Sequence, residues 1–268
     1  MIAIAHSVAT TCYLGAAALA AAPFARPVRA PVRWVILLLG AGVLAHGAGI
    51  AALARVEGQA PMTGLGPALS FAGFVLGAML LAVELIAREV SLTLITAPLA
   101  AFTTIAANLV GTTPIIEPPG ARGAWFVAHI AFSFLGIAAL ATSAAAGTMY
   151  LVQRRELRSR RFGALFRLFP PLQTLDEVNH VALLTAWGGL TLGIAMAVGY
   201  SFAYHQRDVP HLLWAFVAWL CVTTLALGRL FGGWQARRAA LASGAAFVTV
   251  VVLWLAVRVT SSEPGRFL

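Results

Sequence analysis

The chain has few charged residues and no lysine. Of its 268 residues, 10% are charged and 60% are hydrophobic, and the mean hydropathy is +0.89. A soluble domain has about 25% charged residues, so this composition excludes a globular protein exposed to water on all sides and indicates a membrane protein. All 18 basic residues are arginines. No basic-aromatic module accompanies them, so the net charge of +9 does not indicate nucleic-acid binding.

Cysteine is also scarce, with only Cys12 and Cys221. Both lie in hydrophobic runs far apart in the sequence, which excludes a Cys-x-x-Cys pair and a cysteine metal site. The sequence also lacks a nucleophile-plus-base arrangement and a phosphate-binding loop, so we expect no enzyme. The N-terminus has no basic segment of the kind that begins a signal peptide, so we expect residue 2 to start the first retained helix.

Eight hydrophobic runs are each long enough to cross a bilayer, at about 20 residues per crossing. Proline, glycine and charged residues separate the runs, and the weakest break is Arg88-Glu89. The sequence therefore predicts an all-α polytopic membrane helix bundle that forms a single integral membrane domain over residues 1–268. The expected spans are 2–22, 34–54, 67–87, 90–111, 124–152, 178–203, 210–231 and 239–257.

The arginines predict how this bundle lies in the membrane. Segments that follow odd-numbered spans hold 13 of the 18 arginines, and positive charge collects on cytoplasmic loops. We therefore expect both termini on the non-cytoplasmic side of a bacterial-type inner membrane. Within the cytoplasmic loop 153–173, the basic segment 153–169 is expected to extend the fifth span and meet anionic headgroups. A docking surface for a cytoplasmic partner is the alternative interpretation of this segment.

The predicted topology gives each histidine a depth in the bilayer. Only His180 is expected toward the cytoplasm. Ionisable side chains within a membrane are costly and are candidates for function, although a packed, hydrogen-bonded histidine is the alternative interpretation of each. The histidines expected toward the non-cytoplasmic side are His6, His46, His129, His205 and His211.

One helical face combines an imidazole with aromatic, basic and small residues: Arg122, Trp125, His129, Ser133 and Gly136. At 1.5 Å per residue, His129 lies about 10 Å from Arg122 along the fifth span. Such a face suits a flat amphipathic anion such as heme. His129 would ligate the iron, Trp125 would cover the ring above small residues, and Arg122 would bind a propionate. An interfacial belt, with Trp125 and Arg122 as anchors, is the alternative.

A second axial ligand has two candidates. His211 is followed by Trp214 on its own helical face and preceded by Arg207 in a segment rich in aromatic and polar residues. His46, in the outer half of the second span, is the other candidate. Either pair would bind non-covalent heme, expected to be heme b, near the outer leaflet.

Other polar residues have structural interpretations. Glu84 is four residues from Arg88, which predicts an ion pair near the inner end of the third span. Asp176 is expected to start the sixth span as part of an N-terminal capping sequence. Pro98 is expected to kink the fourth span. A small-solute transporter would use such a kink together with Asn108, but the inverted repeats typical of transporters are not visible.

Three stretches, in order, resemble the cytochrome c assembly or heme-handling membrane family, which includes CcsA, CcmC and the small HemX-like proteins. They cover about residues 120–257. The resemblance implies that His129 is an outer-face heme ligand. It also implies a role in cytochrome c assembly or heme homeostasis, with cytochrome c maturation proteins as partners. The stretches are 125–136 with the basic loop that follows, 172–179 with 187–194, and 219–229 with 233–240.

Two features of the larger family members are missing. Members that present heme for attachment carry a loop resembling W-G-x-x-W-x-W-D, whereas residues 200–208 contain no tryptophan and retain only Asp208. The tail after the last span also lacks a histidine. The chain therefore looks most like the HemX-type branch. An alternative role for such a protein is a membrane scaffold that regulates a cytoplasmic heme-synthesis enzyme through the 153–169 segment.

Overall fold

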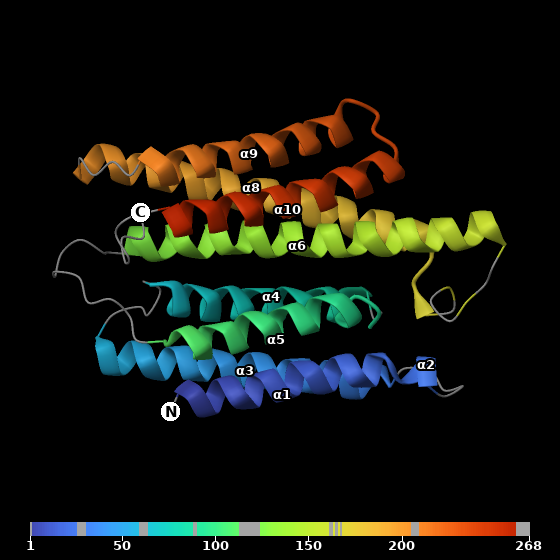
Figure 1. Ribbon diagram of the computed structural model, residues 1–268, viewed down its shortest axis with the longest axis horizontal. Helices are drawn as coiled ribbons and strands as arrows, with labels where there is room; N and C mark the ends of the chain where they lie inside the picture. The colour runs from blue at the N-terminus through green and yellow to red at the C-terminus, as the bar shows by residue number, and fades with distance from the viewer. Residues whose placement is uncertain are drawn as a thin grey trace. The chain divides into compact units, whose positions relative to one another are not determined.

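Nine helices make up most of the described chain. Figure 1 shows them in a ribbon diagram of the computed structural model. The structure describes residues 2–25, 31–58, 64–87, 90–112, 124–160, 163, 166, 168–204 and 209–260. Within these ranges no strand occurs. The helices are α1 (Ile2–Ala20), α2 (Ala22–Ala25), α3 (Val32–Glu57), α4 (Leu65–Ala87), α5 (Thr93–Val110), α6 (Ala124–Ser159), α8 (Leu172–Tyr204), α9 (Val209–Leu230) and α10 (Ala236–Thr260).

Eight of these helices, all except the short α2, are long and apolar enough to cross a membrane. Each corresponds to one predicted span, so the all-α, multi-pass membrane architecture is confirmed. The orientation of the termini stays a prediction.

Helix ends follow the local chemistry of the sequence. α3 ends at Gly58, which adopts a left-handed backbone with φ 67° that glycine accepts without steric cost. α6 continues past its predicted end to Ser159, so the helical extension into the basic loop is confirmed. α8 begins directly after Pro170-Pro171, six residues before the predicted start. The expectation that Asp176 starts this helix was therefore wrong, because the proline pair already sets the helix start.

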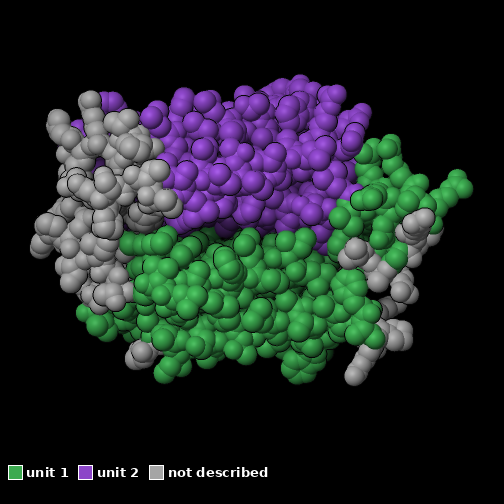
Figure 2. All heavy atoms as spheres, in the orientation of Figure 1, with its two compact units in different colours: residues 1–115, 152–172 green, residues 116–151, 173–268 purple. Residues whose placement is uncertain are grey.

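The chain divides into two compact units, coloured separately in Figure 2. Unit 1 comprises residues 1–115 and 152–172, with helices α1 to α5 and the end of α6. Unit 2 comprises residues 116–151 and 173–268, with the rest of α6 and helices α8 to α10. The prediction of one integral membrane domain over 1–268 stays a prediction.

In unit 1 the helices pack closely where glycines leave room. Gly42 of α3 and Gly77 of α4 both face the Tyr13 ring, and a Cβ at either position would lie within 3.0 Å of it.

Near the end of α4, the Glu84 carboxylate is fully buried and accepts hydrogen bonds from the Thr93 amide and hydroxyl at 3.1 and 2.8 Å. A carboxylate at a helix N-terminus is stabilised by the helix dipole, so Glu84 caps α5. Its predicted partner Arg88 lies outside the described residues.

In unit 2 the helices are joined by hydrogen bonds as well as by packing. Asn179 of α8 is buried, and its amide donates to Ser143 of α6 and Ser243 of α10 at 2.8 to 3.0 Å. α8 and α9 exchange a reciprocal pair of bonds: the Trp187 indole donates to Thr223, and the Trp219 indole donates to Thr191. Because a bilayer offers no water to satisfy these groups, such bonds specify which helices are neighbours.

Candidate site at the crossing of α6 and α8

Helices α6 and α8 pack closely at a pair of glycines. A Cβ at Gly189 would lie 2.9 Å from the Gly136 backbone, and a Cβ at Gly136 would lie 2.8 Å from Leu190. Small residues allow helix backbones in membranes to pack at such short range. The crossing brings the face of α6 that carries the predicted heme site directly against α8.

His129 lies about two turns from this contact, toward the start of α6, and is half-buried. Its Nδ1 lies 2.7 Å from the Gly193 carbonyl oxygen of α8. A carbonyl oxygen only accepts hydrogen bonds, so Nδ1 carries the proton and donates. In the neutral ring the lone pair is therefore on Nε2. Metal-ligating histidines are commonly held in this way, with the second ring nitrogen donating to a carbonyl oxygen.

Trp125 lies one further turn toward the start of α6. Its indole N–H donates to the Met196 carbonyl oxygen at 2.8 Å, and its ring covers Gly199, where a Cβ would lie 2.8 Å from the indole. The side chain is still 53% exposed. Trp125 is therefore fixed to α8 by its polar atom while much of its ring remains open to the surroundings.

The sequence suggested that Ser133 and Gly136 leave open space beside His129. The structure shows that they do not. Ser133 packs against Gly193, where a Cβ would lie 2.5 Å from the Ser133 hydroxyl oxygen, and Gly136 packs against Gly189. Their small side chains serve the helix crossing. The accessible part of the predicted face is therefore the half nearer the start of α6, around His129 and Trp125.

The remaining candidates are placed only in part. Arg122 and Arg207 lie outside the described residues, and of His211 only its position in α9 is described. The Trp214 indole donates to the Val250 carbonyl oxygen of α10 at 3.2 Å, so it joins α9 to α10. His46 belongs to unit 1, where both ring nitrogens take part in hydrogen bonds. The identity of a second axial ligand stays a prediction.

Sequence reasoning missed the residues that hold the end of unit 2 where α8 begins. The Arg229 guanidinium pairs with Asp176 and donates to the Trp234 carbonyl oxygen at 3.1 Å. The Trp234 ring covers Gly228, where a Cβ would lie 2.6 Å from the indole. An acidic residue near one helix start and the stretch Gly-Arg-Leu-Phe-Gly-Gly-Trp at 228–234 were visible in the sequence, but nothing there indicated that they meet.

The fold and this crossing define an all-α, multi-pass membrane protein whose second unit carries a fixed histidine near the start of a long helix. The family described as cytochrome C assembly protein matches residues 43–263. This match covers most of the chain, including α4 to α10, and the chain belongs to that family.

Individual cytochrome c biogenesis proteins are similar to this chain over a shorter stretch. Cytochrome c biogenesis protein CcsA of Prochlorococcus marinus (strain MIT 9515) is 27% identical over 161 residues, which cover 52% of each chain. CcsA of Synechococcus sp. (strain CC9311) is 26% identical over 168 residues, which cover 52% of this chain and 55% of the relative. The chain spans about half the length of the curated relatives it matches.

Proposed function

We propose that the protein is a membrane component of cytochrome c assembly that binds heme at the outer half of the α6–α8 crossing. Membership of the cytochrome C assembly protein family and similarity to the CcsA relatives, which are cytochrome c biogenesis proteins, support a role in this process. The held imidazole of His129 supports the site. The proposed role is that of a carrier or chaperone, without catalysis by the chain itself.

The residues at the crossing fit an axial ligand of heme iron. Because Nδ1 of His129 donates to Gly193, Nε2 is the nitrogen available for the iron. The carbonyl fixes the ring orientation, and the half-exposed Trp125 ring provides an apolar surface one turn away. Heme, expected as non-covalent heme b, would supply the iron that Nε2 coordinates. The chain would contribute this ligand, an apolar contact and, from Arg122, a cation for a propionate.

The HemX-like assignment belongs to the same proposal. Members that present heme carry a tryptophan-rich loop, which residues 200–208 lack. We therefore propose that the protein holds or senses heme in a bacterial-type inner membrane, without presenting it for covalent attachment. His211 remains the candidate for the second ligand, because both ring nitrogens of His46 are hydrogen-bonded within unit 1.

The absorption spectrum of the detergent-purified protein tests this proposal. After heme supplementation, we expect a Soret band and a pyridine hemochrome yield near one heme per chain. In His129→Ala both should fall, because the axial ligand is lost. His180→Ala, which changes another histidine of unit 2, is the matched control and should retain the heme. Unchanged heme content in His129→Ala would remove His129 from the site.

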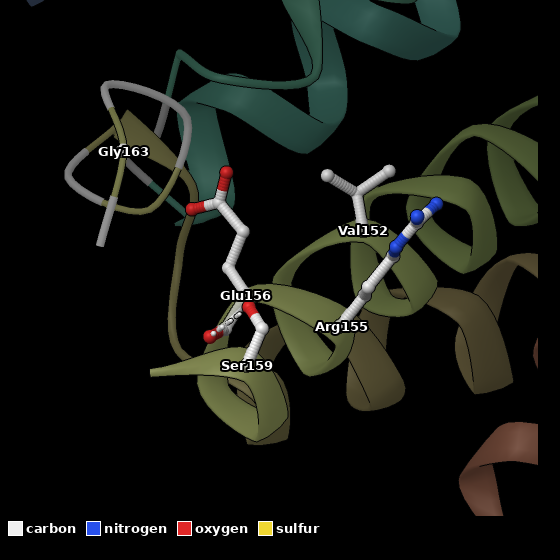
Figure 3. A pocket seen from close by; sticks show the side chains of 5 residues that line it. All are labelled: Val152, Arg155, Glu156, Ser159 and Gly163. Carbon is white, nitrogen blue, oxygen red and sulfur yellow. Dashed lines mark hydrogen bonds between the residues drawn. The ribbon is translucent and has the colours of Figure 1, made fainter. Parts of the chain in front are cut away.

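A second candidate function is regulation of a cytoplasmic heme-synthesis enzyme. The end of α6 exposes Arg155, Arg158 and Arg160, and a surface hollow beside them is lined by Val152, Arg155, Glu156, Ser159 and Gly163 (Figure 3). The Ser159 hydroxyl donates to the Glu156 carbonyl oxygen at 3.1 Å, which helps to hold this last turn of the helix. An exposed cluster of arginines is suited to an acidic partner surface.

Replacing these three arginines with glutamine separates the two functions. If the end of α6 is a docking surface, the triple variant should lose capture of the heme-synthesis enzyme and keep its heme. Capture that survives the triple substitution would contradict the scaffold role and would leave the heme site unaffected.

A further inference from the structure

Unit 1 contains a continuous hydrogen-bonded chain of polar side chains that the proposed heme site does not use. His6 Nδ1 lies 2.8 Å from Asn108 Oδ1, and His6 Nε2 lies 2.8 Å from Ser70 Oγ. His46 Nε2 lies 3.2 Å from the same Ser70 Oγ, and His46 Nδ1 lies 3.5 Å from the Tyr13 hydroxyl. Four helices supply the residues: α1, α3, α4 and α5.

The chain leads from the surface of unit 1 into its interior. Asn108 is exposed near the end of α5, whereas Tyr13, His6 and His46 are all 0% exposed. His6 and Tyr13 are seven residues apart on α1, which is about 10 Å at 1.5 Å per residue. Among the described residues, Ser70 alone hydrogen-bonds to both histidines. The described residues thus form a path with one open end and one closed end.

The donors and acceptors along this path have two consistent orders, which the orientation of the Asn108 amide selects. Asn108 Oδ1 only accepts, so His6 Nδ1 carries a proton and His6 Nε2 accepts from the Ser70 hydroxyl. Ser70 Oγ then accepts from His46 Nε2–H, and His46 Nδ1 accepts from the Tyr13 hydroxyl. Rotating the Asn108 amide, so that its NH₂ group faces His6, reverses every bond. In both orders the two neutral rings carry their proton on different nitrogens, one on Nδ1 and the other on Nε2.

This arrangement also accepts one additional proton without losing a bond between the rings. With the proton on His6, both of its nitrogens donate, Ser70 donates to His46 Nε2, and His46 Nδ1 donates to the Tyr13 oxygen. With the proton on His46, Ser70 donates to His6 Nε2 instead. Conversion between these states breaks the His6 Nε2–H bond as Ser70 Oγ gains that proton, and Ser70 passes its own proton to His46 Nε2. The Ser70 hydroxyl is regenerated, and the net result is that one positive charge moves from His6 to His46.

The charged residues of these four helices lie far from the two histidines and Ser70 along the helix axes. α1 and α5 carry no charged residue, and the charged residues of α3 and α4 are Arg33, Arg55, Glu57 and Glu84. Arg55 is nine residues from His46, about 14 Å along α3, and Glu84 is 14 residues from Ser70, about 21 Å along α4. Cys12 borders the Tyr13 end, beside Gly42. Among the described side chains, no carboxylate or guanidinium bonds to either imidazole.

The two rings also lie too close together to bind heme between them. Their centroids are 4.9 Å apart, with an angle of 77° between the ring planes, so one ring's edge meets the other's face. A porphyrin does not fit between rings in that contact. Moreover, Tyr13 and His6 precede residue 43, where the family match begins. The residues of the cluster all belong to unit 1.

We propose that His6 and His46 form a proton-exchange site that binds a single proton and shares it through Ser70. The site exchanges this proton with water at His6 Nδ1 when the exposed Asn108 side chain rotates away from that nitrogen. Double protonation is disfavoured because two imidazolium charges would lie about 5 Å apart in a medium of low dielectric constant. Ser70 is the positioning residue that couples the rings, and Asn108 fixes the polarity of the path.

Nitrogen NMR of the full-length protein, labelled at histidine and reconstituted in lipid nanodiscs, tests this site. Variants His6→Gln and His46→Gln assign the signals. In the wild type we expect opposite neutral tautomers for the two rings. As the pH falls from about 9 to about 3, a range wide enough for buried histidines, both signals should change with one shared midpoint. The two rings together should take up one proton.

Ser70→Ala should uncouple the rings, so that His6 titrates alone and the His46 signal no longer follows it. Ser70→Thr, which keeps the hydroxyl, should retain the shared midpoint. Ser91→Ala removes another buried serine hydroxyl of unit 1 and should behave like the wild type. Identical tautomers, separate midpoints in the wild type, no titration of either ring, or coupling that persists in Ser70→Ala would each overturn the proposal.

Discussion

Arg229 of α9 forms an ion pair with Asp176 of α8, and this contact joins the second and third sequence stretches that carry the family resemblance. The guanidinium is 12% exposed and the carboxylate 30% exposed. Arg229 also donates to the Trp234 carbonyl oxygen. One side chain therefore connects the turn between α9 and α10 to the first turns of α8.

Loss of this ion pair should destabilise unit 2. For Asp176→Asn we expect a loss of about 1 kcal/mol in unfolding free energy, because the pair is partly shielded from water but still screened at its carboxylate. Thermal unfolding in detergent measures the change. Glu177→Gln alters the neighbouring exposed carboxylate and should have little effect. Equal losses in the two variants would show that the ion pair is not the cause.

Two adjacent glycines of α8 should respond differently to the same substitution. A Cβ at Gly189 would lie 2.9 Å from the Gly136 backbone, whereas a Cβ at Gly188 would have no neighbour within 4 Å. We expect Gly189→Ala to cost about 1–3 kcal/mol through overpacking and to weaken heme binding by shifting Gly193 relative to His129. Gly188→Ala should be neutral or slightly stabilising. Thermal unfolding and heme titration measure both effects, and matching results for the two variants would contradict the close crossing.

The reciprocal tryptophan–threonine bonds should contribute to the pairing of α8 and α9. Thr223→Val removes the acceptor of the Trp187 indole and should cost about 0.5–1.5 kcal/mol, which is typical of hydrogen bonds between membrane helices. The adjacent Thr224 hydroxyl bonds within its own helix, to the Leu220 carbonyl oxygen. Thr224→Val is thus the control, and unfolding curves of both variants give the difference. A larger loss of unfolding free energy for Thr224→Val than for Thr223→Val would contradict this role of the Trp187–Thr223 bond.

The predicted topology places both termini outside the cytoplasm. Alkaline phosphatase, which is active only after export, should therefore be active when fused to either terminus. Green fluorescent protein fused after Ser159, at the end of α6, should fluoresce in the cytoplasm, because the arginines of that segment hold it inside. Inactive phosphatase at both termini would reverse the orientation.

The eight spans were predictable because each depends on local composition. About 20 apolar residues are enough to satisfy a helix in a bilayer, whatever its neighbours are. The extension of α6 past residue 152 followed in the same way from an uninterrupted helical sequence. The start of α8 was misplaced because the capping pattern at Asp176 was given more weight than the proline pair before it.

The candidate site was predictable only in part. The 3.6-residue period of a helix placed Trp125 and His129 on one face from the sequence alone. The same period placed Ser133 and Gly136 on that face, but only the packing of α8 decides that these two are closed off. The Gly193 carbonyl oxygen that fixes the His129 tautomer is a backbone atom 64 residues away, so side-chain spacing carries no trace of it.

Sequence alone therefore determined the membrane class, the number of spans, the helical faces and the family, because all four depend on composition, period and order along one chain. Tertiary structure decided which faces meet. It brought His6 and His46 together through Ser70, although 40 residues separate the histidines, and it divided the helices into two units. Contacts between helices depend on the shape and polarity of two surfaces at once, and a single helix encodes only one of them.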